Sequence, residues 1–177
     1  MAKITIFGMA GTGKSSTGQE IAKRLGYEYH SHGGFFRETA ARLGITLNEL
    51  DELSKTDSST DIECDKTIAE LGKNHDGIVV EGRLAWYFIP DSFKVCLKCD
   101  FETRTKRIAD REKKDLVQVQ SETKERESAI YERFNRYYGI TNFEDEKNFD
   151  LVIDTASLNF EQVVETIINN LKDRKII

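Results

Sequence analysis

The feature that most constrains this chain is the glycine-rich segment GMAGTGKS at residues 8–15. It follows a β-branched run at residues 4–7 and precedes a helical pattern over residues 16–25. A strand, a loop of the form G-x-x-x-x-G-K-[ST] and a helix in this order form the Walker A arrangement. Its glycines let backbone N–H groups turn toward a polyphosphate, and the helix N-terminus adds partial positive charge. The chain is therefore predicted to bind a nucleoside triphosphate.

Within this phosphate loop (residues 8–15), each polar residue has an expected task. Lys14 is predicted to bridge the β- and γ-phosphates, and the Ser15 hydroxyl to lie on Mg²⁺. The expected contacts to ATP, continuing into the first helical turn, come from Gly8, Gly11, Thr12, Gly13, Lys14, Ser15 and Ser16.

The composition limits the class of protein. The 177 residues fit one domain, and 38% hydrophobic with 32% charged residues is typical of a globular chain. A net charge of −5 argues against a nucleic-acid-binding protein, which needs a basic surface. We expect no membrane span, because no apolar run approaches about 20 residues. The absence of a signal-peptide pattern and the odd number of cysteines favour a cytoplasmic location.

The three cysteines are not expected to bind a metal. Cys96 and Cys99 form a C-x-x-C pattern, and His30 and His32 are the nearest candidates to complete a zinc site. An odd spacing within a strand places Cys96 and Cys99 on opposite faces, and no second cysteine pair accompanies them. Ordinary strand residues are the preferred interpretation.

Strand and helix patterns alternate along the chain. Helices are predicted over 33–43, 58–71, 101–112, 122–138 and 160–171, and strands over 27–31, 77–82, 93–99 and 150–155. A capping box at Thr46–Glu49 predicts one more helix, with Leu47, Leu50 and Leu53 on one face. Residues 113–120 are polar without a period and are predicted to be structureless. This alternation predicts an α/β fold in which helices cover both faces of a parallel sheet.

Two further segments carry candidate phosphate-binding residues. In the first, residues 31–37, Arg37 lies one turn into a predicted helix, where its guanidinium suits a second phosphate; a solvated arginine is the alternative. In the second, Glu81-Gly82-Arg83 follows a buried strand at the edge where α/β sheets bind ligands. Glu81 is predicted to organise Mg²⁺, and Arg83 to contact phosphate.

A group of arginines follows in two helices. Arg104, Arg107 and Arg111 repeat at helical spacing, as do Arg126 and Arg133 on the next predicted helix. Two arginine-bearing helices joined by a mobile segment describe a lid over phosphates. Ion pairs with Glu122, Glu127 and Glu132 on solvated helices are the alternative.

Taken together, these segments resemble the nucleoside monophosphate kinases, and most closely their short, archaeal-type cytidylate kinase branch. The similarity covers the phosphate loop, the S-x-G-x-x-F-R pattern at residues 31–37 and EGRLA at 81–85. It continues through RIADRE at 107–112, Arg126-Glu127, Arg133 and the final strand DLVIDT from Asp150. The departures are Met9-Ala10, Gly34 and Trp86, and the last two lie near the expected acceptor pocket.

The resemblance implies a three-layer P-loop fold with a five-stranded sheet in the order 2-3-1-4-5. It implies one domain with a core of residues 1–31, 77–110 and 121–177. A monophosphate-binding segment would span residues 32–76, and a lid residues 111–120. It also implies Mg²⁺-dependent transfer of phosphate from ATP to CMP or dCMP by a monomer.

The site residues carried over from this resemblance fall into three sets. Arg107 would pack on the ATP base, and Lys14, Arg111, Arg126 and Arg133 would act on the transferred phosphoryl group. Ser15 and Glu81 would hold the metal. The acceptor would contact Ser31, Gly33, Phe36, Arg37, Arg83, Asp61 and Asp65.

The sequence leaves three alternatives open. Asp61 and Asp65, candidates with Ser31 for contacting the cytosine, could instead form the solvated face of a helix. The enzyme could act on AMP, UMP or a non-nucleotide acceptor. A regulatory module that binds ATP without turnover is the alternative outside the enzyme class.

Overall fold

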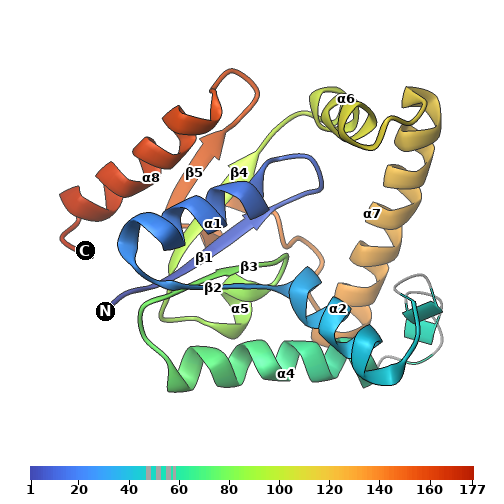
Figure 1. Ribbon diagram of the computed structural model, residues 1–177, viewed down its shortest axis with the longest axis horizontal. Helices are drawn as coiled ribbons and strands as arrows, with labels where there is room; N and C mark the ends of the chain where they lie inside the picture. The colour runs from blue at the N-terminus through green and yellow to red at the C-terminus, as the bar shows by residue number, and fades with distance from the viewer. Residues whose placement is uncertain (47–48, 51–52, 55–56, 58) are drawn as a thin grey trace.

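A computed structural model describes residues 1–46, 49–50, 53–54, 57 and 59–177. Its centre is a five-stranded sheet in the order β2-β3-β1-β4-β5, with all neighbouring pairs parallel (Figure 1). The predicted strand order is therefore confirmed. The strands are β1 (Lys3–Gly8), β2 (Glu28–Ser31), β3 (Ile78–Glu81), β4 (Phe93–Lys98) and β5 (Leu151–Asp154).

Helices cover both faces of this sheet, as the alternating pattern predicts. The described helices are α1 (Lys14–Leu25), α2 (His32–Leu43), α4 (Ser59–Asn74), α5 (Ala85–Phe88), α6 (Phe101–Glu112), α7 (Leu116–Tyr138) and α8 (Phe160–Asp173), with the 3₁₀ turn η1 at Glu146–Asn148. Helices α1 and α8 pack through one core cluster on one face. On the other face, α4 and α5 share one apolar cluster and α7 packs through another.

The predictions for the segment after α2 are confirmed in part. The capping box is confirmed: the Thr46 hydroxyl accepts a hydrogen bond from the Glu49 N–H at 3.2 Å, and the Glu49 carboxylate accepts from the Thr46 N–H at 2.7 Å. Of the leucine face behind it, Leu50 is buried and Leu53 is exposed. Leu47, the interior of the capping box and the first residue of the helix expected over 58–71 lie outside the described residues. The short helix α5 had not been predicted.

The prediction that residues 113–120 are structureless is wrong. Helix α6 ends at Lys113, which adopts a left-handed backbone with φ of 54°, and α7 begins at Leu116. Asp115 caps α7 by accepting a hydrogen bond from the Gln118 N–H at 3.0 Å. Val119 is buried against Ile108 and Ala109 of α6. One capped turn and one apolar contact are therefore enough to make this polar stretch helical.

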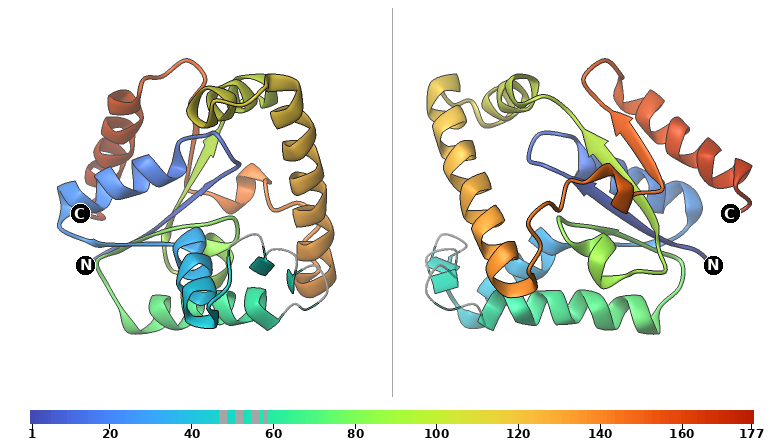
Figure 2. Two further views of the ribbon diagram at one scale, coloured as in Figure 1. Left: turned by 45° about the vertical axis from the view of Figure 1, so that its right-hand side comes forward. Right: turned by 180° about the vertical axis from the view of Figure 1, so that it is seen from behind.

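Helix α7 links two distant parts of the molecule. Its first turns pack on α6, and its last turns contact the first turns of α4 (Figures 1 and 2). Its buried Ile130 and Phe134 pack with Phe7 and Phe143 beneath the sheet. One continuous helix of 23 residues thus runs from the expected lid to the expected monophosphate-binding segment.

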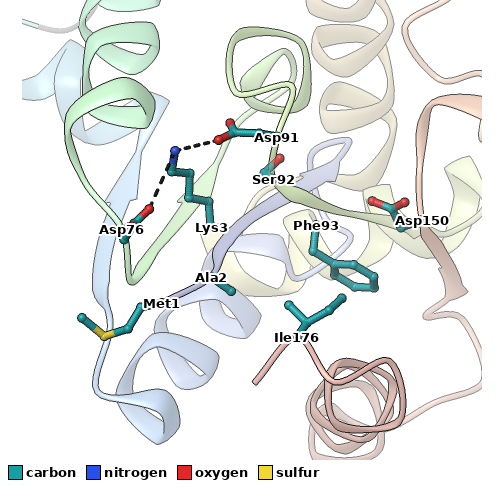
Figure 3. Close-up of a pocket in the computed structure, with 9 residues that line it drawn as sticks. All are labelled: Met1, Ala2, Lys3, Asp76, Asp91, Ser92, Phe93, Asp150 and Ile176. Atoms are coloured by element: carbon teal, nitrogen blue, oxygen red, sulfur yellow. Dashed lines mark hydrogen bonds and ion pairs between the residues drawn. The ribbon is translucent and has the colours of Figure 1, made fainter.

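A cavity of about 550 Å³ lies at the amino edge of the sheet, away from the phosphate loop (Figure 3). Lys3, the first residue of β1, lies there between Asp91 and Asp76, at 2.7 and 3.8 Å. This cavity therefore lies at the edge opposite to the carboxyl edge, where parallel α/β sheets bind ligands. None of the described helices is both long enough and apolar enough to cross a membrane.

Candidate functional site

The phosphate loop leaves β1 at the carboxyl edge of the sheet and turns directly into α1. Gly11 and Gly13 have φ of 86° and 88°, which side chains with a Cβ rarely adopt. A Cβ on Gly11 would also lie 2.6 Å from the Arg104 carbonyl oxygen. Gly13 is the N-cap of α1 and supplies no side-chain hydrogen bond to the helix. The first N–H groups of α1 are therefore left to an anion.

The outer side of this loop is held by Arg104, a residue that sequence reasoning grouped with the lid. Its Nη1 donates to the Ala10 carbonyl oxygen at 3.0 Å and to Glu127 at 2.7 Å. Its Nε donates to the Cys99 carbonyl oxygen at 3.2 Å. The expectation that Arg104, Arg107 and Arg111 form one phosphate-facing row is therefore wrong for Arg104, which is buried in structural contacts.

Glu81 ends β3 beside the first turn of α1. The Ser15 hydroxyl donates to its Oε1 at 3.2 Å, and the Lys14 Nζ lies 3.9 Å from its Oε2. Glu81 is only 6% exposed, and its Oε2 has no hydrogen-bond partner among the described residues. A buried carboxylate oxygen without a donor is costly unless a cation or water occupies the space beside it. This arrangement fits Mg²⁺, which takes few protein ligands and completes its shell with phosphates and water.

Positive charge is concentrated around this carboxylate. Burial lowers the pKa of Lys14; Glu81 opposes this, and Arg83, Arg111 and Arg126 add to it. Burial also lowers the pKa of Arg83 to about 10, with further repulsion from Arg126 and Arg133, and its Nε has no hydrogen-bond partner among the described residues. A polyanion bound here would relieve both effects.

The segment at residues 31–37 lies on the neighbouring strand end. Ser31 pairs with Glu81 in the β2–β3 register, and its side chain caps α2 by accepting from the Gly34 N–H at 2.8 Å. Phe36 is buried in α2, whereas Arg37 is exposed, with its Nη1 3.6 Å from where a Cβ on Gly33 would lie. Arg37 therefore lies on the exposed side of this turn.

Tyr29 belongs to the same region and was missed by sequence reasoning. Its ring packs against α1 at Gly18, where a Cβ would come within 2.9 Å of it. Burial and the nearby Glu81 carboxylate raise the pKa of its phenol to about 12, while Ser31 and Ser15 oppose the shift. The phenol thus lies between the two candidate phosphate sites. No sequence motif marks it, because its position depends on the packing of β2 against α1.

The two acidic residues of α4 both contact α7. Arg133 donates through Nη1 to both carboxylate oxygens of Asp61, each at 2.9 Å. The Tyr138 hydroxyl donates to Asp65 Oδ2, and the His32 Nε2 lies 3.6 Å from Asp65 Oδ1. Both aspartates are buried, so they do not form the solvated face that was the alternative interpretation.

The remaining arginines differ in their surroundings. Arg107 donates to the Thr155 carbonyl oxygen at 2.7 Å and to its hydroxyl at 3.3 Å, beyond the end of β5. The Arg111 side chain is 67% exposed and pairs with Glu112 at 2.8 Å. Arg126 projects from the exposed side of α7. Arg111 and Arg126 thus both lie at the surface, on α6 and α7 respectively.

Comparison with known proteins decides the family. A sequence profile described as the cytidylate kinase-like family matches residues 3–157. The chain belongs to the cytidylate kinase-like family. Among members of known name, a cytidylate kinase from Archaeoglobus fulgidus is 35% identical over 175 residues, covering 98% of this chain and 97% of that protein. The similarity to the short, archaeal-type branch is thereby confirmed.

This cytidylate kinase-like chain is also similar to one longer protein in sequence and to one solved structure in fold. An S-adenosylmethionine-dependent nucleotide dehydratase from Lacinutrix mariniflava is 36% identical over 169 residues, which cover 95% of this chain but only 35% of that longer protein. A shikimate kinase structure from Bacteroides thetaiotaomicron has a TM-score of 0.69 at 14% identity, covering 97% of this chain and 98% of the other. That structural likeness confirms the P-loop kinase fold.

Proposed function

We propose that this protein transfers the γ-phosphoryl group of ATP to CMP, and to dCMP, giving ADP and the cytidine diphosphate. The observation that carries the proposal is the environment of Glu81. One of its oxygens accepts from Ser15, the other faces Lys14 without a hydrogen bond to the described residues, and Arg83 follows two positions later. Membership of the cytidylate kinase-like family supports CMP as the acceptor.

On the donor side, the phosphate loop and the first N–H groups of α1 bind the triphosphate. Lys14 lies on the β- and γ-phosphates and neutralises charge that develops between them. Ser15 and Glu81 are the residues that would hold Mg²⁺, which supplies further charge neutralisation at the transferred group. Arg107 would lie against the adenine base, held by its hydrogen bonds to Thr155.

On the acceptor side, Arg37 and Arg83 bind the phosphate of CMP, and Ser31, Gly33 and Phe36 shape the turn beneath it. A CMP phosphate oxygen forms the new bond to the γ-phosphorus while the bond from that phosphorus to the β-bridging oxygen breaks. The electron pair leaves with ADP. Arg111, Arg126 and Arg133 are proposed to stabilise the negative charge on the phosphoryl group during its transfer. A well-placed arginine raises kcat by a factor of about 10³–10⁵.

The proposed lid segment is largely helical. Residues 111–120 comprise the end of α6, the turn at Lys113 and the first turns of α7. Closure of this corner would bring Arg111 and Arg126 onto the donor phosphates and exclude water, whose attack would waste ATP. We further propose a monomeric enzyme of the cytoplasm, consistent with its three free cysteines; sedimentation of the purified chain tests the oligomeric state.

Two other functions use the same fold. Phosphorylation of another monophosphate or of a small alcohol would need only a different monophosphate-binding segment. An ATP-binding regulatory module would need no intact acceptor site. The buried Arg83 Nε, which has no hydrogen-bond partner among the described residues, argues against such a module.

A coupled assay with ATP, Mg²⁺ and a panel of CMP, dCMP, UMP, AMP and shikimate tests the proposal. We expect the highest kcat/KM for CMP, with dCMP next. Turnover of shikimate without turnover of CMP would replace the proposed acceptor. Tight ATP binding without transfer to any acceptor would support the regulatory module.

A further inference from the structure

The contacts between α4 and α7 assign a task to Asp61 that differs from contacting the acceptor base. We infer that Asp61 is a positioning residue, which anchors Arg133 so that the rest of its guanidinium faces the transferred phosphoryl group. This inference rests on the proposed phosphoryl transfer and adds a residue that acts through another.

The Asp61 carboxylate is almost inaccessible to a ligand. Asp61 is 2% exposed, and both of its oxygens lie 2.9 Å from the same arginine nitrogen. A carboxylate that recognises cytosine must present an oxygen to the exocyclic amine of the base. Both Asp61 oxygens are buried and directed at Arg133, so reaching a base would mean turning the carboxylate away from its paired charge, a costly exchange. Asp61 is therefore poorly placed to recognise the base.

Arg133 is held in place on one side of its guanidinium. Among the residues that the structure describes, Arg133 is hydrogen-bonded through Nη1 alone, and its guanidinium carbon lies 5.4 Å from the centroid of the Phe134 ring. Its side chain is 26% exposed, and it lies close enough to Arg83 to lower the pKa of that guanidinium. A planar guanidinium anchored at one nitrogen has lost much of its rotamer entropy before a phosphate arrives. Arg133 is thus preorganised beside the acceptor-phosphate residue Arg83.

Neighbouring residues hold the Asp61–Arg133 ion pair in place. Asp65 lies one helical turn after Asp61 and accepts from the Tyr138 hydroxyl, five residues beyond Arg133. His32, at the start of α2, lies against Asp65 and stacks on Phe36, with ring centroids 5.2 Å apart. The two carboxylates therefore fix α7 to the monophosphate-binding segment at two points. A site supported in this way holds its donors in place better than a single surface ion pair.

The test is a double-mutant cycle on the full-length chain, using D61N, R133M and the double variant. Asn keeps the shape of Asp61 but removes its charge. We expect D61N to lower kcat for CMP about 10- to 100-fold, with the ratio of kcat/KM for CMP to that for UMP unchanged within twofold. In the R133M background, D61N should change kcat less than twofold, because Asp61 then has no arginine to position.

The control is E63Q, which removes an exposed acid from the same helix; among the described residues, Glu63 forms an ion pair with Arg42 alone. Its kcat and base selectivity should equal those of the wild type. A tenfold or larger change in the CMP-to-UMP ratio of D61N would show that Asp61 contacts the base and would overturn the inference. An equal loss of kcat in both backgrounds would overturn it as well.

The variant R133K covers the case in which D61N does not fold. Lysine can still pair with Asp61, but it lacks a second nitrogen fixed in the same plane, so we expect kcat to fall at least tenfold at unchanged base selectivity. Near-wild-type turnover of R133K would refute the inference. A wild-type chain that transfers phosphate to no acceptor defeats the proposed function, and this inference with it. An active wild type with additive effects defeats the inference alone.

Discussion

Replacing Arg104 with methionine should separate the arginines that hold the phosphate loop from those that act on phosphate. Methionine keeps much of the apolar volume of the side chain while removing every hydrogen bond of the guanidinium. In R104M, the Ala10 and Cys99 carbonyl oxygens lose their donors, and Glu127 loses its ion-pair partner at 2.7 Å. The variant therefore tests both the stability of the core and the order of the loop.

The magnitude follows from burial. Removing one partner of a fully buried ion pair costs about 3–5 kcal/mol. The side chains of Arg104 and Glu127 are 8% and 17% exposed, so water can reach part of the stranded carboxylate. We therefore expect a loss of about 2–4 kcal/mol in the free energy of unfolding. At 2–4 °C per kcal/mol for a chain of this size, the melting temperature should fall by roughly 4–16 °C.

The loop should also bind ATP less well. Ala10 lies within the phosphate loop, so without its anchor ATP must order the loop on binding; an ordering cost of about 1.4 kcal/mol corresponds to a KM for ATP about tenfold higher. Calorimetry and steady-state kinetics measure the two effects. R111M is the matched control, since Arg111 lies on the same helix, is 67% exposed and, within the described part of the chain, forms an ion pair with Glu112 alone. It should melt within about 1 °C of the wild type yet lose turnover. An R104M enzyme with wild-type melting and wild-type KM for ATP would refute the reasoning.

Four further predictions concern the site itself. K14A should lower kcat about 10²–10³-fold with an unchanged circular dichroism spectrum, and near-wild-type turnover would exclude Lys14 from the phosphates. R37A should raise KM for CMP about tenfold or more at constant KM for ATP, and the reverse pattern would mean that the two sites are assigned backwards. E81Q should raise the Mg²⁺ concentration for half-maximal rate about 10-fold, and an unchanged Mg²⁺ titration would remove Glu81 from the metal site. ATP binding should take up protons at alkaline pH below the ordinary lysine pKa of 10.5, because burial lowers the pKa of Lys14 in the free protein and phosphates raise it again. Calorimetry in two buffers detects this uptake, which K14M should abolish; equal uptake by K14M would assign it to another group.

The sequence predicts the core of this protein well, because its signals are local. The buried run before Glu81 and the glycines of the phosphate loop define strand ends and turns by themselves. Helix α6 has the predicted bounds, since its N-cap Asp100 and its apolar face are both visible in the sequence. Parallel pairing then follows from the alternation of strands and helices.

Prediction fails where a side chain has a partner far away in the chain. Arg104 has the same helical spacing as Arg107 and Arg111, and only folding reveals that it contacts Ala10, 94 residues away. The start of α7 was missed for a different reason. Asp115 and Gln118 carry a recognisable helix-start pattern, but the polar residues around them mask the single apolar contact of Val119.

The unbroken course of α7 has a consequence for how sequences of this kind can diverge. A helix of 23 residues is about 34 Å long and advances 100° per residue. Exchanging an outward-facing side chain between Arg126 and Arg133 leaves the direction of both arginines unchanged. Inserting or deleting one residue there would swing one of them a quarter-turn or more away from the other. Between Arg126 and Arg133 we therefore expect sequences of this kind to diverge by substitution and not by insertion or deletion. The seven-residue spacing of the two arginines should persist even where the residues between them have changed.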